Sequence, residues 1–381
     1  MRILFLTPTY LPNQGGVEIF LSDLAVWFNS QGQDIKIIAQ KYPRRLTTRE
    51  VINGVEVFRC LFFDPKPPAL KLKSIAAYIY AFILFPFNFF KFLWTMDRFN
   101  PDVINYHFPG AANYFLLLYL RFRKVKLIVS LHGSDVRELP YESSISRRLL
   151  KKTLKRADFI IANSKYILKE GNLIESSITA KSTVIYNGID KKNFNSQEAH
   201  KQQGKYIFAM GRFIEKKGFD ILIKAFGEVA QHNDNISLII AGDGPRRSGL
   251  KRLVGDLGLR DKIKLLAWSD RGQIVKYLKG CEFFVLPSRY EAFGMAVIES
   301  LSAGKPVIAT ACGGPEEIIK NGINGILVEK ENSRALAGAI RELLTNRKLF
   351  TDLIEGARNS IGGFGIEKTG QEYLTIFRRC E

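Results

Sequence analysis

The chain has 381 residues, of which 46% are hydrophobic and 24% are charged. Because single domains usually hold about 100–200 residues, this length favours two globular domains, and the composition excludes a disordered chain. A formal net charge of +19 suggests polyanionic surroundings such as nucleic acid, anionic lipid headgroups or phosphorylated substrates. The plain alternative is a well-solvated basic surface.

The cysteines and the amino-terminal residues bear on the cellular compartment. Four cysteines (Cys60, Cys281, Cys312 and Cys380) lack any C-x-x-C spacing, so neither a zinc site nor a disulfide scaffold is indicated. The apolar run at residues 1–8 is too short for a signal peptide and predicts a first strand. We therefore expect a cytoplasmic protein.

Short β-branched runs alternate with longer helical patterns, which predicts βαβ units and parallel sheets. The first series of strands is expected near residues 2–6, 35–39, 55–60, 103–106, 126–131, 158–161 and 183–186. After a polar stretch at 190–205, the second series is expected near residues 206–210, 237–241, 262–266, 282–286, 306–309 and 325–328. A terminal helix follows Gly362-Gly363. Two doubly wound domains bind ligands at the carboxyl ends of their strands, so the site should draw residues from both.

Residues 75–94 are almost continuously apolar and aromatic. The segment is long enough to span a bilayer, but Pro86, Asn88 and Lys91 interrupt it and strands are expected on both sides. A buried crossover helix and a helix docked in a membrane interface are equally compatible with this pattern. Flanking basic residues favour the interfacial alternative, since they suit anionic headgroups.

The most informative motif lies at residues 288–299, after a strand and at the start of a helix. Its helix amides, at Phe293, Gly294 and Met295, form a suitable site for a phosphate. Glu291 precedes the helix, and Glu299 lies about one and a half turns into it, about 7–8 Å along its axis. Two carboxylates so placed could hold two hydroxyl groups on either side of a diphosphate.

The pattern S-x-x-E-x-F-G-x-x-x-x-E, followed by A-G-x-P-V, resembles the signature of retaining glycosyltransferases of family 4, which have the GT-B fold. Further motifs that match are Gly15-Gly16, His132-Gly133-Ser134-Asp135, Asn187-Gly188-Ile189-Asp190, Gly211-Arg212-x₄-Lys217-Gly218 and Gly242-Asp243-Gly244-Pro245. The resemblance implies an α/β fold with two doubly wound Rossmann-like domains that face each other across a cleft. We expect an acceptor-binding domain at 1–190, a nucleotide-sugar-binding domain at 191–364, and a helix at 365–381 that crosses back to the first domain.

The resemblance also implies roles for individual residues. Glu291 would hold the hydroxyls of the transferred sugar, Glu299 would bind the ribose, and His132 would face the sugar. Arg212 and Lys217, in a loop at the carboxyl edge of the second sheet, would stabilise the charge that grows on the leaving diphosphate. The expected nucleotide-sugar contacts also include Gly15, Gly16, Phe293, Gly294, Met295 and Trp268, and the expected acceptor contacts are Asp135 and Arg137.

Other nucleotide-site patterns are missing from the sequence. Arg247 replaces the third glycine of the dinucleotide fingerprint, and there is neither a P-loop nor a D-x-D motif, so neither a nicotinamide cofactor nor a metal is called for. We therefore expect a retaining, metal-independent transferase that uses a UDP-, GDP- or ADP-sugar and has no cofactor.

The expected acceptor is a glycan or a polyprenyl-diphosphate-linked sugar used in cell-surface polysaccharide synthesis. The enzyme would then work in the cytoplasm, with an anionic membrane surface as a partner and no nucleic acid. Two alternatives stay open: a nucleotide-sugar 2-epimerase of the same fold, and a non-catalytic basic protein that binds a membrane surface.

Overall fold

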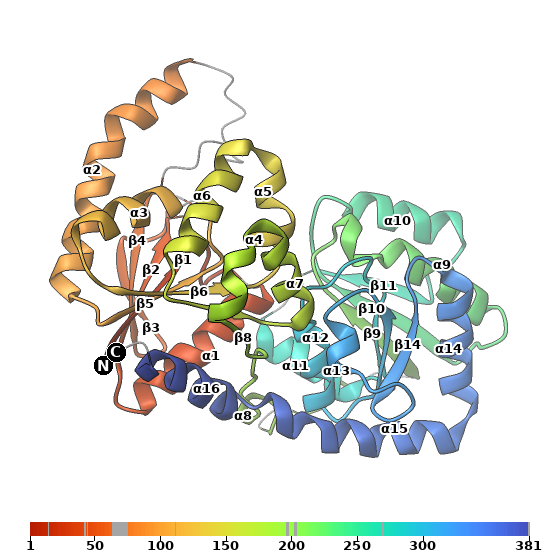
Figure 1. Ribbon diagram of the computed structural model, residues 1–381. Coiled ribbons are helices and arrows are strands. Elements are labelled where there is room, and N and C mark those ends of the chain that lie inside the picture. The colour runs from red at the N-terminus through yellow and green to blue at the C-terminus, as the bar shows by residue number, and fades with distance from the viewer. Residues whose placement is uncertain are drawn as a thin grey trace. The chain divides into compact units, whose positions relative to one another are not determined.

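The computed structural model describes residues 1–379 except 14, 42, 44, 63–74, 111, 196–197, 202–203 and 268–269. For residues 75–85 and 195 it describes the backbone alone. The chain forms two compact units (Figure 1). The first comprises Met1–Gly188 and Ile366–Glu381, and the second comprises Ile189–Gly365. Both are α/β units built on mainly parallel sheets, which confirms the predicted fold class.

The sheet of the first unit has eight strands in the order β3-β4-β2-β1-β5-β6-β7-β8. Their bounds are β1 Arg2–Thr7, β2 Asp34–Gln40, β3 Arg49–Ile52, β4 Val55–Cys60, β5 Val103–His107, β6 Lys126–Leu131, β7 Phe159–Ala162 and β8 Ser182–Val184. Strands β1, β5 and β6 are almost wholly buried, because helices cover both faces of a doubly wound sheet. Only β3 among the described strands pairs antiparallel, with β4.

Strand β3 is the one described strand that the apolar pattern failed to predict. It joins β4 through a hairpin turn at Asn53 and Gly54, whose φ angles are 51° and 79°. Asn-Gly is the most common pair for a two-residue turn that needs positive φ at both positions. That dipeptide was the available signal, but β3 is short and half exposed, so its own residues carry little pattern.

The described part of the first unit also contains nine helical segments, the last of which is the C-terminal helix. They are α1 Gly16–Ser30, α2 Ile75–Phe99, α3 Asn113–Phe122, α4 Ser134–Arg137, α5 Leu139–Glu142, α6 Ser144–Arg156, α7 Lys165–Ile174, the 3₁₀ helix η1 Ser176–Lys181 and α16 Ile366–Arg379.

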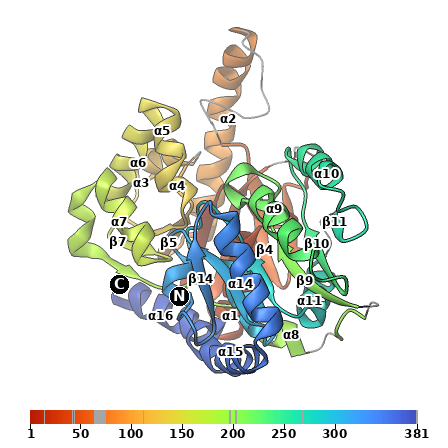
Figure 2. The same ribbon diagram turned by 90° about the vertical axis from the view of Figure 1, so that its right-hand side faces the viewer.

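The apolar segment at 75–94 belongs to helix α2, which has two different faces. Phe92 and Met96 are fully buried, whereas Phe87, Phe90 and Trp94 are 70%, 67% and 57% exposed. The amino-terminal half of α2 extends away from the rest of the unit in both views (Figures 1 and 2). The side chains of Tyr78, Tyr80, Phe82 and Phe85 lie outside the described residues. Within the part of the chain that is described, no helix meets both the length and the hydropathy that a membrane crossing requires.

The sheet of the second unit has six parallel strands in the order β11-β10-β9-β12-β13-β14. Their bounds are β9 Lys205–Met210, β10 Ile236–Ala241, β11 Ile263–Leu266, β12 Phe284–Leu286, β13 Val307–Ala311 and β14 Gly325–Glu329. The helical segments are α8 Lys192–Asn195, η2 Glu215–Lys217, α9 Phe219–Ala230, α10 Arg247–Asp256, α11 Arg271–Gly280, α12 Met295–Ser302, α13 Pro315–Ile318, α14 Ser333–Thr345, α15 Arg347–Ser360 and η3 Ile361–Phe364. All six strands lie at the predicted places.

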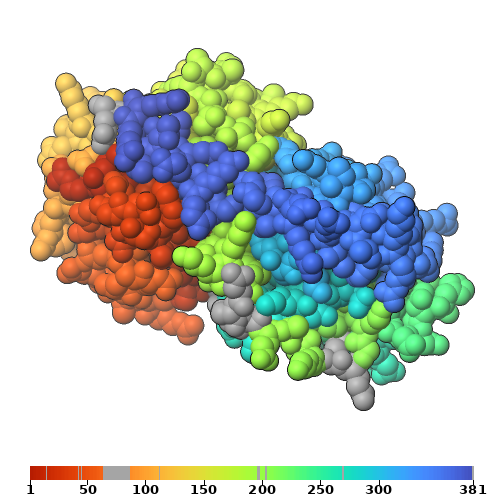
Figure 3. All heavy atoms as spheres, turned by 90° about the horizontal axis from the view of Figure 1, so that it is seen from below, coloured from red at the N-terminus to blue at the C-terminus, as the bar shows by residue number. Residues whose placement is uncertain are grey.

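Helix α16 packs against α1 within the first unit, although it ends the chain (Figure 3). The rings of Phe28 and Phe377 stack with centroids 5.5 Å apart. A Cβ atom on Gly370 would lie 2.2 Å from the Trp27 ring, so glycine is needed where the two helices meet. The first unit therefore takes its last helix from the end of the sequence.

Candidate active site

The carboxyl edge of the second sheet brings together two of the predicted site residues. Lys217 lies in the loop after β9 and Glu291 in the loop after β12, 74 positions apart in the sequence. Their Nζ and Oε2 atoms are 2.5 Å apart, and the side chains are only 18% and 16% exposed. The Ser288 hydroxyl donates a second hydrogen bond to Glu291, at 3.3 Å. A cation and a carboxylate thus share one sheltered position.

Backbone geometry allows these two loops to approach each other. Gly218 has a φ of 63° and directly precedes α9, and a Cβ atom there would lie 2.0 Å from the Pro287 carbonyl oxygen. The loop that bears Lys217 thus comes closest to the loop that bears Glu291 at Gly218, where only glycine leaves enough space. Any side chain at this position would push the loops apart.

Helix α12 begins at Met295, directly after the Glu291 loop, with Gly294 as its N-cap at a φ of 111°. No side-chain hydrogen bond caps this end, and the amides at an uncapped helix start are suited to an anionic ligand. The Phe293 ring, by contrast, is buried and lies 6.1 Å from the Phe364 ring. Only the backbone of Phe293 can therefore take part in binding.

Two further predicted contacts lie on the same unit. Glu299 sits in the second turn of α12 and is 8% exposed, so its carboxylate is largely shielded from water. Arg212 follows Gly211 after β9, and its side chain is exposed and forms no hydrogen bond or ion pair with other described residues. Trp268 lies outside the described residues.

In the first unit, His132 follows β6 and His107 ends the neighbouring strand β5. A hydrogen bond of 3.0 Å joins His107 Nδ1 and His132 Nε2, and both side chains are buried. Burial lowers the pKa of His132 to about 3. The pKa of His107 is also held well below its usual range, mainly by burial and to a lesser degree by the neighbouring His132. Both rings are therefore neutral. The sequence analysis missed His107, although two histidines at the ends of adjacent parallel strands were a usable signal.

Asp135, the first of the two expected acceptor contacts, follows β6 in the first turn of α4. Its side chain is fully buried, and its carboxylate accepts hydrogen bonds from the amides of His132 and Gly133. It therefore fixes the backbone that carries His132. Arg137 does lie at the surface, where it contacts the Tyr166 hydroxyl and pairs with Glu170 at 3.8 Å.

Gly15 and Gly16 lie where α1 begins, and Gly15 is its N-cap. A Cβ atom on Gly15 would lie 2.2 Å from a carboxylate oxygen of Glu18, in the first turn of the helix. A diphosphate at these amides would meet that negative charge, so Glu18 would have to turn away.

Acidification should lower the free energy of unfolding through the buried histidine pair. Below the ordinary histidine pKa of about 6.5, the unfolded chain binds protons that the folded pair does not. Each histidine therefore lowers the free energy of unfolding by up to about 1.4 kcal/mol for each pH unit of acidification. Burial raises the pKa of Asp135 to about 6, so this carboxyl binds a proton first in the folded state and opposes part of the loss. Urea unfolding between about pH 7 and pH 5 measures the slope. His107→Gln should make it shallower, and equal slopes in both proteins would contradict this prediction.

Comparison with known proteins decides the family. A model described as "Glycosyltransferase Family 4" matches residues 14–193, and one described as "Glycosyl transferases group 1" matches residues 190–360. An uncharacterised glycosyltransferase of Methanocaldococcus jannaschii is 34% identical over 270 residues, covering 70% of this chain and 72% of the relative. The chain belongs to the group 1 glycosyltransferases of family 4.

Other relatives and solved structures agree with this assignment. A second relative is the N-acetylgalactosamine-N,N'-diacetylbacillosaminyl-diphospho-undecaprenol 4-alpha-N-acetylgalactosaminyltransferase of Campylobacter jejuni. This chain is 27% identical to it over 278 residues, which cover 71% of this chain and 74% of the relative. The fold of this chain matches sucrose-phosphate synthase of Thermosynechococcus elongatus with a TM-score of 0.82 at 19% identity, covering 100% and 99% of the two chains. It also matches Anabaena HepE, solved with UDP-glucose, with a TM-score of 0.76 at 20% identity over both full lengths. The solved structures show the fold alone, whereas the names of the relatives favour a transferase over the epimerase and the non-catalytic binder.

Proposed function

We propose that this glycosyltransferase moves a sugar from a nucleotide diphosphate sugar to a lipid-linked or glycan acceptor, with retention of the anomeric configuration. The observation that carries the proposal is the pairing of Lys217 with Glu291 beside the uncapped start of α12. This arrangement sets a cation and helix amides, which suit a diphosphate, next to a carboxylate that can accept hydrogen bonds from sugar hydroxyls.

In the proposed reaction, the bond between the anomeric carbon and the diphosphate oxygen breaks, and negative charge grows on the diphosphate. Lys217, Arg212 and the first amides of α12 stabilise that charge. The acceptor hydroxyl attacks from the same face, and its proton passes to the leaving diphosphate oxygen. Glu291 then orients the sugar and forms no covalent bond to it. His132, being neutral, acts as a hydrogen-bonding group.

The direct test is a panel of UDP-, GDP- and ADP-sugars. Hydrolysis of the donor and thermal stabilisation by each nucleotide diphosphate identify the base, and NMR of the product reports its anomeric configuration. An inverted product would contradict retention. No stabilisation by any nucleotide would contradict the donor site itself.

We further propose that no divalent metal is needed. Lys217, Arg212 and the helix amides would neutralise the diphosphate in its place. Turnover should therefore stay within about twofold when EDTA is added in excess. A complete loss of turnover that Mg²⁺ or Mn²⁺ restores would contradict this.

The acceptor proposal rests on the name of the Campylobacter relative, which specifies a diphospho-undecaprenol substrate. Such a lipid lies in a bilayer, so the enzyme would have to work at a membrane surface. We propose the cytoplasmic face and a role in cell-surface polysaccharide synthesis. The exposed face of α2 fits this: Phe87, Phe90 and Trp94 follow the spacing of one helix face, and Arg98 packs 5.1 Å from the Trp94 ring.

Liposome flotation tests the membrane contact. Binding should require anionic lipid, weaken as salt rises, and fall when Phe87, Phe90 and Trp94 are all changed to Ser. Phe92 is unsuitable for this test because it is buried. Leu173→Ser, on an equally exposed apolar side chain of α7, is the matched control and should bind normally. If the wild type stays soluble with anionic liposomes at low salt, the membrane proposal is wrong.

A further inference from the structure

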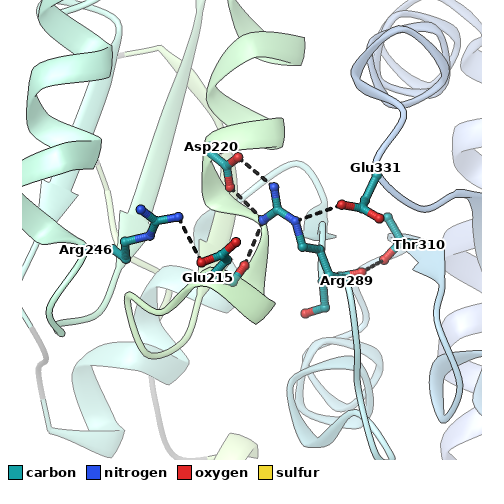
Figure 4. Close-up of polar contacts among 7 residues, drawn as sticks. Glu215, Asp220, Arg246, Arg289, Thr310 and Glu331 are labelled. Atoms are coloured by element: carbon teal, nitrogen blue, oxygen red, sulfur yellow. Dashed lines mark hydrogen bonds and ion pairs between the residues drawn. The ribbon is translucent and has the colours of Figure 1, made fainter.

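A single arginine ties together loops that follow three strands of the second sheet (Figure 4). Arg289 follows β12, and its guanidinium contacts residues after β9 and after β14. We call Arg289, Glu215, Asp220 and Glu331 the Arg289 network. Arg246, in the loop after β10, joins it through an ion pair of 3.2 Å with the Glu215 carboxylate.

The strongest contact in the Arg289 network is the pair with Asp220, in the first turn of α9. Nη1 and Nη2 of Arg289 donate to the two carboxylate oxygens of Asp220 at 2.9 and 2.8 Å. This is the two-point geometry that a planar guanidinium can form and an ammonium cannot. The hydrogen bond from Arg289 holds the pKa of Asp220 below its usual range, so the pair stays charged.

Two more hydrogen bonds run from Arg289 to the backbone next to Lys217. Nη1 donates to the Glu215 carbonyl at 2.8 Å, and the Arg289 amide donates to the Lys216 carbonyl at 2.8 Å. On the opposite side, Nε donates to Glu331 at 3.1 Å. The guanidinium thus makes four hydrogen bonds within the protein, and these hold it between the loops that it contacts.

The residues that make these contacts lie next to Lys217 and Glu291 in the sequence. Arg289 lies two residues before Glu291, and Glu215 and Lys216 directly precede Lys217. The Arg289 network therefore joins the same two loops that bear the Lys217–Glu291 pair. A Lys side chain is long and has several rotatable bonds, so its ammonium reaches a defined place only if its backbone is held.

We propose that Arg289 and Asp220 are positioning residues that fix the Lys217 loop against the Glu291 loop, so that the ammonium meets the donor diphosphate where its charge develops. The inference rests on the proposed function of Lys217. It assigns a role to two charged residues that need not touch the substrate. The competing explanation is that the pair only stabilises the unit.

A double-mutant cycle separates the two explanations. Lys217→Ala should lower kcat/KM for the donor by about a hundredfold, and Asp220→Asn by about tenfold. In the Lys217→Ala background, Asp220→Asn should change kcat/KM by less than about twofold, because there is no longer an ammonium to position. A merely structural role would reduce activity by the same factor in both backgrounds. Thermal unfolding of each variant confirms that the protein compared is folded.

Two further variants complete the experiment. Arg289→Lys keeps the charge but loses the two-point geometry, so it should match Asp220→Asn in kcat/KM. Asp97→Asn removes a similar two-point pair with Arg123, at 3.1 and 2.9 Å on the surface of the first unit, and should leave kcat/KM unchanged. Equal effects of Asp220→Asn with and without Lys217, or no effect in a folded variant, would overturn the inference. Wild-type activity of Lys217→Ala alone would instead overturn the proposed function.

Discussion

Glu291→Ala should lower turnover by at least about a hundredfold, because misplacing the transferred sugar by even about 1 Å costs that much. The carboxylate is held in place by the ammonium of Lys217 and the hydroxyl of Ser288. It can therefore present its remaining lone pairs to sugar hydroxyls in a fixed direction. Donor hydrolysis and transfer, both measured at saturating donor, report the loss as a change in kcat.

The same substitution should leave nucleotide diphosphate affinity unchanged or slightly higher. Glu291 neutralises Lys217 at 2.5 Å, and its removal leaves the ammonium free to pair with the diphosphate. Calorimetric titration with the nucleotide diphosphate measures this directly. Glu355→Ala, on the exposed surface of α15, is the control and should change neither value. Affinity that falls together with turnover would place Glu291 at the nucleotide instead of the sugar.

The parallel strands could be predicted because their sequences are nearly continuous apolar runs. Strands buried on both faces, such as β5 and β6, need no alternation, and they stand out against the helices between them. The edge strand β3 is only half buried, so its pattern is weak and the Asn53-Gly54 turn was the better signal. The extent to which a strand is buried thus determines how clearly its apolar pattern can be recognised in the sequence.

The common location of Lys217 and Glu291 could also be predicted, since both follow parallel strands whose carboxyl ends lie at one edge. Their direct contact could not, because it depends on the conformation of two loops and on Gly218 beneath Pro287. The same limit applies to the pairing of Arg289 with Asp220. Loop conformations have no periodicity, so contacts between loops leave no pattern in the sequence.

Side-chain directions in the first unit could not be predicted for a related reason. A motif gives the type of a residue but not the direction of its side chain. Asp135 belongs to the matching motif, yet its carboxylate turns inward to the His132 amide. Phe92 and Phe90 lie two positions apart in α2 and face the core and the solvent respectively. In each case the packing of neighbouring elements, which is not local in sequence, decides the direction.

Glu299→Ala should weaken nucleotide diphosphate binding by about ten- to hundredfold, since hydrogen bonds to a charged group contribute about 1.5–3 kcal/mol. Glu299 is 8% exposed in the second turn of α12, whose first amides are proposed to bind the diphosphate. A ribose lies beside its diphosphate, so one helix can serve both groups. A shielded carboxylate is not weakened by competing water, which favours strong hydrogen bonds to the two ribose hydroxyls.

The comparison with Glu291→Ala makes this prediction specific. Glu299→Ala should raise the dissociation constant of the free nucleotide diphosphate, whereas Glu291→Ala should not. Glu299→Gln preserves the size of the side chain, so it separates the loss of charge from the loss of packing in α12. A 2′-deoxy nucleotide diphosphate should bind the wild type less tightly than the ribonucleotide does. The two nucleotides should bind Glu299→Ala with equal affinity. Equal affinity of the wild type and Glu299→Ala for the ribonucleotide would show that Glu299 is part of the helix core and does not bind the ribose.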